Sequence, residues 1–167
     1  MSAAIIGTDG FIGGRLAELL PGAIHTTHKP RETDGRWPFD LRDFGPLPKA
    51  DVIYVCAGIN GQMKCEGRPE SHHVNVDAKI RLAKHYLDIG GFMVFLTSRS
   101  LEWSASVYSR QHALLEAVLI TMPVAIVRAG RVTSANITNL CETMIAIGEG
   151  RISGLTVWGT DDISYDK

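Results

Sequence analysis

Three glycines recur at every third residue near the N-terminus, in the segment Gly7-Thr-Asp-Gly10-Phe-Ile-Gly13. An apolar run at 3–6 is typical of a strand and residues 11–20 have helical periodicity, so the glycines stand at a strand-to-helix turn. Such a turn lets backbone N–H groups approach a phosphate, and the positive end of the helix dipole faces the anion. The pattern predicts a loop that receives the pyrophosphate of a dinucleotide, together with the intervening residues Thr8, Asp9, Phe11 and Ile12. The alternative is a turn whose glycines satisfy backbone geometry only.

The segment after the second expected strand bears on the choice between the two nicotinamide dinucleotides. NAD sites usually have an acidic residue about 20 residues beyond the glycine loop, where it binds the ribose 2′-hydroxyl. This chain has no acid there and instead has His28, Lys29 and Arg31. Cations at this point can form charge-assisted hydrogen bonds with a 2′-phosphate, so the sequence favours NADP, with NAD as the alternative. In the other interpretation, Lys29 and Arg31 are solvated loop charges.

Short apolar runs alternate with longer segments of helical periodicity. We expect strands at 3–6, 23–27, 51–56, 92–97, 124–127 and 155–158, and helices at 11–20, 69–89, 105–121 and 137–147. Residues 28–47 are polar and rich in Pro and Gly, so they are expected to be mostly loop, with a short buried segment near Phe39. The alternation predicts a Rossmann-type α/β fold, a doubly wound parallel sheet in a three-layer α/β/α arrangement. Residues 1–167 are expected to form a single NAD(P)-binding domain without a full C-terminal substrate domain.

Seven further segments carry a family pattern. They are Phe39-Asp-Leu41, Asp51-Val-Ile-Tyr-Val-Cys-Ala-Gly58, Cys65-Glu-Gly-Arg-Pro-Glu70, Val74-Asn-Val76, Phe95-Leu-Thr-Ser98, Tyr108-Ser-Arg-Gln-His-Ala-Leu-Leu-Glu116 and Val127-Arg-Ala-Gly-Arg-Val132. Together with the glycine loop, they resemble the extended short-chain dehydrogenase/reductase superfamily, and most closely the cofactor-binding part of the dTDP-4-dehydrorhamnose reductases. The resemblance covers nearly the whole chain.

The resemblance implies a role for each matched residue. Tyr108 is implied as the group that exchanges a proton with the reacting oxygen, and Ser98, or Ser100 if the loop is shifted, as the hydroxyl that polarises this oxygen. Asn75 is implied as the structural asparagine of the long helix, and His112 stands where the family has a lysine near the cofactor. Further cofactor contacts are implied for Asp40, Leu41, Cys56, Ala57, Gly58, Thr97 and Ala129.

Two departures from the family pattern bear on activity. In the family, a lysine four residues after the tyrosine lowers the tyrosine pKa, whereas the reference pKa of about 6.5 for histidine leaves His112 mostly neutral at pH 7. In addition, only ten positions separate Ser98 from Tyr108, and the chain stops where the family continues into substrate-binding segments.

These features predict that the chain is an NADP-dependent oxidoreductase or epimerase that acts on a nucleotide-sugar or similar carbonyl compound. Without a cation beside the phenol we expect little or no turnover, which His112→Lys should raise. The alternative is a catalytically impaired dinucleotide-binding module that needs a partner chain, and a third possibility is an interaction scaffold that binds no nucleotide.

Composition argues against several other classes of protein. Lys and Arg number 17 against 18 Asp and Glu, so the net charge of −1 gives no electrostatic footprint for nucleic acid or an anionic membrane. Cys56, Cys65 and Cys141 are isolated, and His72-His73 has no third ligand nearby in sequence, so no metal site is expected. Because no apolar run is long enough for a membrane span or a signal peptide, we expect a cytoplasmic protein with reduced thiols.

The resemblance also implies a homodimer. Related enzymes pack the helices that correspond to 69–89 and 105–121 into a four-helix bundle. Apolar residues that could supply this face are Val74, Ile80, Leu82, Leu87, Leu114, Leu115 and Val118. The alternative is that these side chains face the sheet of their own chain.

Overall fold

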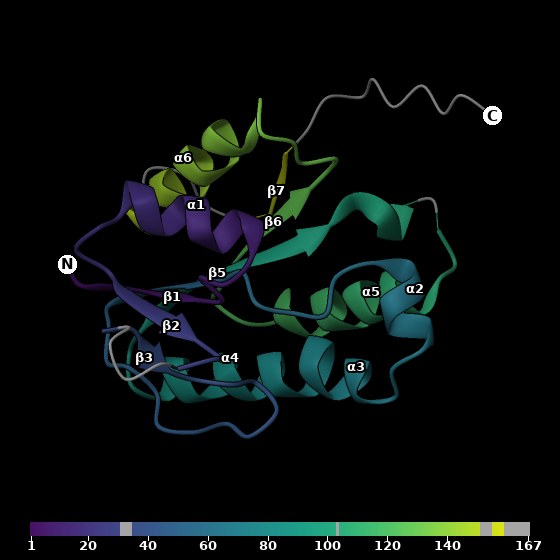
Figure 1. The fold of residues 1–167 in the computed structure, drawn as a ribbon, viewed down its shortest axis with the longest axis horizontal. Coiled ribbons are helices and arrows are strands. Elements are labelled where there is room, and N and C mark those ends of the chain that lie inside the picture. The colour runs from purple at the N-terminus through teal and green to yellow at the C-terminus, as the bar shows by residue number, and fades with distance from the viewer. Residues whose placement is uncertain (31–34, 103, 151–154, 159–167) are drawn as a thin grey trace.

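A parallel sheet forms the centre of the fold. The computed structural model describes residues 1–30, 35–102 and 104–150, and the backbone of the strand at 155–158. In this part of the chain, seven strands lie in the order β3-β2-β1-β4-β5-β6-β7, and every neighbouring pair is parallel (Figure 1). The strands are β1 (Ala3–Ile6), β2 (Ile24–Thr27), β3 (Trp37–Pro38), β4 (Val52–Val55), β5 (Phe92–Ser98), β6 (Ala125–Ala129) and β7 (Leu155–Trp158). The strand order reverses between β1 and β4.

Helices cover both faces of the sheet (Figure 1). On one face, α1 (Phe11–Leu19) and α6 (Ile137–Gly148) pack against each other. The other face carries α3 (Glu70–His72), the π-helical turn η1 (His73–Asp77), α4 (Ala78–Asp88) and α5 (Val107–Leu119). Two short elements lie in the connections, α2 (Gln62–Glu66) and the 3-10 turn η2 (Arg99–Glu102).

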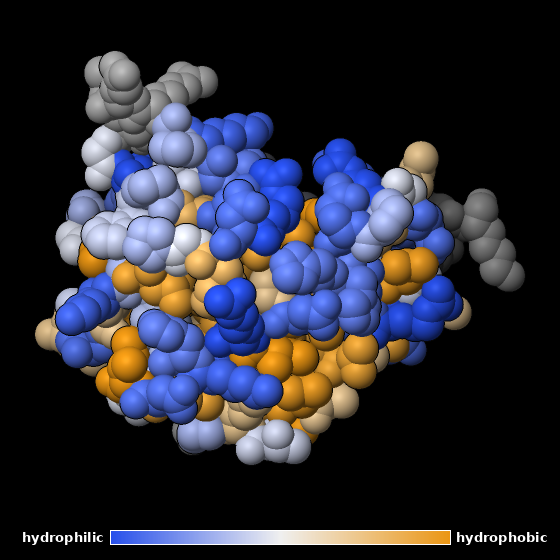
Figure 2. Space-filling view, turned by 90° about the horizontal axis from the view of Figure 1, so that it is seen from below, coloured by the Kyte–Doolittle hydropathy of each residue, from blue (hydrophilic) through white to orange (hydrophobic). Residues whose placement is uncertain are grey.

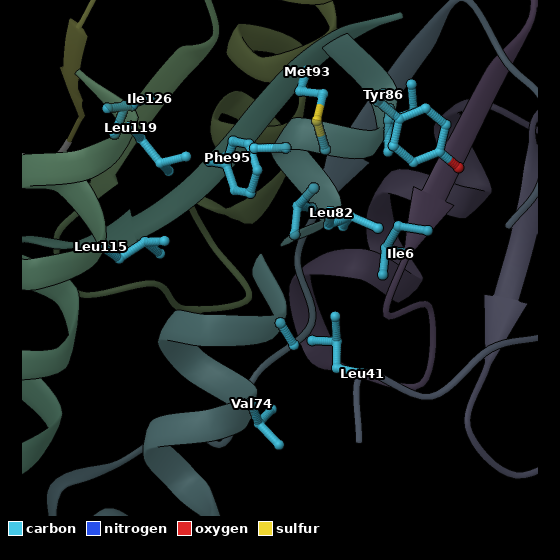
Figure 3. Packing of buried hydrophobic residues seen from close by; sticks show 14 of the residues in the cluster. Ile6, Leu41, Val74, Leu82, Tyr86, Met93, Phe95, Leu115, Leu119 and Ile126 are labelled. Atoms are coloured by element: carbon cyan, nitrogen blue, oxygen red, sulfur yellow. The ribbon is translucent and has the colours of Figure 1, made fainter. Parts of the chain in front are cut away.

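The strands supply two apolar cores, one on each face of the sheet, because successive side chains of a strand point to opposite sides. Ile5 and Ile6 are neighbours in sequence and both are buried, yet they belong to different cores. The core that includes Ile6 also contains Leu82, Tyr86, Met93, Phe95, Leu115 and Leu119 (Figure 3). The core that includes Ile5 also contains Leu16, Tyr54, Val94, Val127, Leu140 and Met144. The apolar side of each long helix therefore packs against one of the two faces of the sheet.

The expected fold is confirmed as a Rossmann-type doubly wound α/β fold, and the boundaries of the expected elements differ by two residues or fewer. Three local features were not expected. β3 forms at the sheet edge, where a proline is tolerated because one side of the strand needs no partner, and the Phe39 amide then donates to the Thr27 carbonyl at 2.9 Å. α2 is a helix within a segment that had no assignment, and η1 interrupts the α-helical pattern of the long helical segment.

The proposed dimer face needs a correction. Val74, Leu82 and Leu115 are buried in the core of their own chain, because they lie on the sides of α4, α5 and η1 that face the sheet. The remaining four residues are partly or well exposed, namely Ile80, Leu87, Leu114 and Val118. On the face seen from below, apolar patches are separated by hydrophilic side chains (Figure 2). The homodimer stays a prediction, and it now depends on these four residues, of which Leu114 is the most exposed.

Candidate active site

Two adjoining cavities lie at the carboxyl ends of the central strands, beside the point where the strand order reverses. Ligands of open α/β sheets bind at this point. The β2-side cavity has a volume of about 330 Å³ and is lined by residues that include Thr26 and His28. The α5-side cavity has a volume of about 240 Å³ and is lined by residues of the glycine loop and of α5. Ala57 and Asn60 line both, so the two cavities form one cleft.

Most residues that the sequence singled out line this cleft. Those in the β2-side cavity are Gly7, His28, Asp40, Leu41, Ala57 and Gly58. Those in the α5-side cavity are Gly10, Phe11, Ile12, Gly13, Cys56, Ala57, Thr97, Ser98, Tyr108, His112 and Ala129. Five others line neither cavity, namely Thr8, Asp9, Lys29, Asn75 and Ser100. Arg31 lies outside the described residues.

The three glycines of the loop serve different purposes. Gly7 has a φ of +101°, and a Cβ built on it would lie 2.6 Å from the Ala57 nitrogen, so the fold itself requires glycine. A Cβ on Gly13 would overlap the Gly7 carbonyl, which keeps α1 close to β1. Gly10 has an ordinary φ of −88°, and the nearest atom to its Cβ would be the Gly7 oxygen at 3.4 Å. The fold does not require glycine at position 10, and this residue leaves the cavity open above the loop.

The N-terminus of α1 opens into the α5-side cavity. Its N-cap residue is Gly10, which has no side chain to accept a hydrogen bond from the first turn. The first three residues of the helix, Phe11, Ile12 and Gly13, also line the cavity. Backbone N–H groups in the first turn of a helix have no partner within the helix, and the helix dipole favours negative charge there. This arrangement suits a phosphate or pyrophosphate group.

Thr8 and Asp9 join the glycine loop to the end of β2. The Thr8 hydroxyl donates to the Thr26 carbonyl at 2.6 Å, and the Asp9 carboxylate accepts from the Thr27 hydroxyl at 2.8 Å and the His28 amide at 3.0 Å. Burial tends to raise the pKa of Asp9, but the hydrogen bonds from Thr27, His28 and Arg36 hold it below its usual value. Asp9 is therefore an anion that holds the loop.

Arg36 is a residue of this region that the sequence did not point to. Its guanidinium lies 2.8 Å from the Asp9 carboxylate, and His28 Nδ1 lies 2.9 Å from the other carboxylate oxygen. Lys29, which the sequence favoured for the same purpose, is exposed. No local signal separates Arg36 from other loop arginines, because its position beside the glycine loop depends on the path of the chain from β2 to β3.

Tyr108 stands in the first turn of α5, which begins at the N-cap Ser106. The centroid of its ring lies 4.4 Å from that of the His112 ring, at an interplanar angle of 73°. Burial raises the pKa of the Tyr108 phenol, and a hydrogen bond with Ser98 offsets part of this rise. Burial, together with the charge of Lys79, lowers the pKa of His112 to about 3. His112 is therefore neutral at pH 7, and its Nδ1 atom has no hydrogen-bond partner in the described part of the chain.

Geometry favours Ser98 over Ser100 as the hydroxyl beside Tyr108. Ser98 lines the α5-side cavity, whereas Ser100 does not. The Ser98 hydroxyl donates to the Ser100 hydroxyl at 3.0 Å, and Ser109 also donates to Ser100 at 3.1 Å. Ser100 thus holds Ser98 in place beside the phenol.

Asn75 organises the site from behind the cavity. It is 2% exposed, and its amide accepts from the Ile59 amide at 2.8 Å and donates to the Ile59 carbonyl at 3.0 Å. It also donates to the Gln111 side chain at 2.8 Å. Asn75 therefore links the segment after β4 to η1 and α5.

An ionic network centred on the buried Glu116 fixes the far side of the cavity. The Glu116 carboxylate is 6% exposed, accepts a hydrogen bond from the Thr97 hydroxyl and lies 2.6 Å from the Arg128 guanidinium. The same guanidinium lies 3.7 Å from Glu102. This network joins the ends of β5 and β6 to α5, because its members come from each of these elements.

The part of the chain that the structure describes contains neither a cluster of metal-ligating side chains nor a membrane-spanning helix. No group of three or more His, Cys, Asp or Glu side chains there could hold a metal ion, and His72 and His73 instead lie near Asp77, at 3.6 and 3.8 Å. No helix there has both the length and the apolar character that crossing a bilayer requires.

Comparisons with known proteins agree on the fold. No protein-family model matches the sequence, and a search of curated proteins found no match. Among solved structures, a hypothetical dTDP-4-dehydrorhamnose reductase from Sulfolobus tokodaii superposes with a TM-score of 0.77 at 18% identity, covering 94% of this chain and 76% of that one. A short chain dehydrogenase from Burkholderia cenocepacia in complex with NADP gives 0.73 at 16% identity, covering 95% and 88%.

A UDP-N-acetylglucosamine 4-epimerase from Methanobrevibacter ruminantium, in complex with UDP-N-acetylmuramic acid, gives a TM-score of 0.77 at 13% identity and covers 95% of this chain and 76% of that one. At such identities the likeness establishes the fold. The chain has the fold of the extended short-chain dehydrogenases/reductases, as the sequence resemblance predicted.

Proposed function

We propose that this chain binds a nicotinamide dinucleotide and uses it to reduce or oxidise a carbonyl or hydroxyl compound through Tyr108 and Ser98. The observation that carries the proposal is the composition of the α5-side cavity. One wall of this cavity is the glycine loop with the uncapped N-terminus of α1, and another bears Ser98 and Tyr108. An anion site and a proton donor therefore open into the same space.

The division of the cleft into two cavities supports a dinucleotide as the ligand. Such a cofactor consists of two nucleotides joined by a pyrophosphate, and the cleft consists of two cavities that share Ala57 and Asn60 and are each lined by part of the glycine loop. Gly7 lines the β2-side cavity, whereas Gly10 lines the α5-side cavity. We assign the adenosine half to the β2-side cavity, near Asp40 and Leu41, and the nicotinamide half to the α5-side cavity.

The chemistry then follows from the residues around the second cavity. A bound reduced nicotinamide would supply hydride to a carbonyl carbon. Tyr108 would donate its phenolic proton to the carbonyl oxygen, and Ser98 would donate a hydrogen bond to the same oxygen. A phenol titrates near pH 10, so proton release near neutrality requires about 4 kcal/mol of stabilisation of the phenolate. In the reverse direction Tyr108 would accept the proton.

A nucleotide-sugar or similar carbonyl compound is the substrate class that we propose. The support is the bound UDP-N-acetylmuramic acid of the epimerase with the same fold. A second candidate function is that of a dinucleotide-binding module without turnover of its own, and the observation that favours it is the neutral His112. A cytoplasmic location stays a prediction.

Turnover separates these two functions. The proposed function predicts that the chain oxidises NADPH in the presence of a nucleotide-sugar ketone, in contrast to the little or no turnover expected from His112 alone. Tyr108→Phe should lower this rate about 100-fold or more while NADPH affinity is kept, because the phenol donates a proton and only general acid–base catalysis is lost. Ser98→Ala should slow turnover more than Ser100→Ala, since only Ser98 lines the cavity. The measurement is NADPH absorbance over a panel of nucleotide-sugars, with calorimetry for binding.

Two outcomes of this assay would count against the proposal. Binding of NADPH without turnover of any compound of the panel would favour the module, and turnover that is insensitive to Tyr108→Phe would remove Tyr108 from the mechanism. Absence of dinucleotide binding would contradict both functions.

Two basic residues that contact Asp9, His28 and Arg36, bear on the proposed cofactor preference. We expect NADPH to bind more tightly than NADH, because His28 lines the β2-side cavity and Arg36, which contacts the same Asp9 carboxylate, lies beside the glycine loop, the region that we assign to a 2′-phosphate. Arg36→Ala should reduce the preference about tenfold, which corresponds to one charge-assisted hydrogen bond of about 1.5 kcal/mol. The measurement is the pair of dissociation constants from calorimetry.

Lys84→Ala is the matched control for Arg36→Ala, since Lys84 is an exposed cation on α4, whereas Arg36 contacts Asp9 of the glycine loop. Equal affinities of the parent for NADPH and NADH would remove the assignment of NADP, and so would a preference that Arg36→Ala leaves unchanged.

A further inference from the structure

A buried lysine stands in the α5-side cavity, where the sequence had led us to expect no cation. Lys79 belongs to α4, is 3% exposed, and lines this cavity together with Tyr108 and His112. Within the described part of the chain, no carboxylate forms an ion pair with it. Charged lysines are almost never buried unless they are paired, so an unpaired one beside a cavity requires an explanation.

The surrounding backbone is arranged to admit the ammonium group. A Cβ built on Gly58 would lie 3.1 Å from Lys79 Nζ and 2.9 Å from Asn75 Oδ1. The space that a larger residue at position 58 would fill is thus the space into which Lys79 extends. Asn75 and Lys79 are four residues apart, so they project from the same side of the helical segment.

The charge of Lys79 acts on His112, the ring neighbour of Tyr108. It contributes to the lowered pKa of His112, after burial, and the centroids of the His112 and Tyr108 rings lie 4.4 Å apart. His112 cannot supply a positive charge itself, because its pKa is about 3. Among the described residues that line this cavity, Lys79 is the one with a cationic side chain.

We propose that Lys79 supplies the cation of the Tyr108 site, from α4, in place of a lysine at position 112 of α5. The inference rests on the proposed function, because it assigns a task in proton transfer. When the phenol donates its proton, the phenolic O–H bond breaks, an O–H bond forms on the substrate oxygen, and the negative charge stays on the Tyr108 oxygen. Lys79 keeps its own protons and stabilises this phenolate until solvent returns the proton. It is a positioning residue, since it acts through Tyr108.

The test measures the phenol directly. Difluorotyrosine, whose phenol titrates closer to neutrality than that of tyrosine, is incorporated at position 108 of the full chain, and its pKa is read from ¹⁹F chemical shifts. We expect Lys79→Met to raise this pKa by about 1 to 3 units, the effect of removing an opposite charge nearby. Lys84→Met removes an exposed lysine from the same helix and should leave the pKa unchanged.

Rescue variants separate charge from structure. Lys79→Arg keeps a cation and should restore most of the pKa, and the Lys79→Met, His112→Lys double variant should do so as well, because position 112 lies one turn after Tyr108 on the same face of α5. His112→Lys alone places a second ammonium near Lys79, and the two like charges repel each other. We therefore expect a lysine at position 112 to lower the phenol pKa only in the double variant.

The same samples are titrated with NADPH, so that the role of Lys79 and the proposed function can be refuted independently of each other. A phenol pKa that Lys79→Met leaves unchanged overturns the role of Lys79, even when NADPH binds. A phenol pKa that rises in Lys79→Met and recovers in the double variant supports the role of Lys79, and failure of NADPH to bind would then overturn only the proposed function.

Discussion

Gly10→Val is expected to weaken dinucleotide binding several hundred-fold and to leave the fold intact. The valine side chain would occupy the space above the uncapped N-terminus of α1, where the pyrophosphate is expected. Losing two charge-assisted hydrogen bonds of about 1.5 to 2 kcal/mol each corresponds to a factor of several hundred in affinity. The fold survives because position 10 has an ordinary φ and its Cβ would have no neighbour closer than 3.4 Å.

Calorimetry with NADPH and thermal unfolding measure the two parts of this expectation. Gly22→Val is the matched control, because a Cβ at this position meets nothing within 4 Å and Gly22 does not line the cleft. Gly13→Val provides the contrast, since its Cβ would overlap the Gly7 carbonyl and the fold itself should fail. Unchanged affinity in Gly10→Val would show that the glycine loop does not receive the pyrophosphate.

Lys79→Met is expected to make the protein more stable at pH 7, by about 3 kcal/mol. Burial lowers the pKa of Lys79 to about 8 from an ordinary value of 10.5, and each unit of difference between folded and unfolded states is worth about 1.4 kcal/mol. The unfolded chain therefore binds this proton more tightly than the folded chain. Below pH 8 the folded protein carries the full cost of a buried charge, and as the pH rises from about 8 to 10.5 this cost is lost.

Denaturant unfolding between pH 6 and 11 measures how the cost of the buried Lys79 charge changes with pH. The free energy of unfolding of the parent should approach that of Lys79→Met as the pH rises through this window, whereas Lys84→Met should follow the parent throughout, because Lys84 is exposed. A loss of stability in Lys79→Met at pH 7 would mean that the ammonium is held by favourable contacts. A gain in stability that accompanies the loss of phenol activation is the usual exchange between stability and activity at a functional site.

Local sequence determined the parts of this protein that depend on neighbouring residues. The alternation of short apolar runs with amphipathic segments was enough for the strands and helices, because each element must bury one face and the periodicity records which face. The glycine loop was recognisable for the same reason, since its strand, turn and helix are contiguous. Parallel strands also bring their carboxyl ends to one edge, so the residues after β1, β4 and β5 could be expected to meet there.

Tertiary structure decided which charges surround the cleft. Arg36 reaches Asp9 across the connection from β2 to β3, and Lys79 reaches the Tyr108 cavity from a different helix. Neither position follows from spacing, because contacts between distant segments depend on how the elements pack. The sequence showed that position 112 lacks a lysine, and it could not show that α4 places one in the same cavity. The position of this lysine depends on Gly58, whose missing side chain leaves room for an ammonium that comes from the neighbouring helix α4.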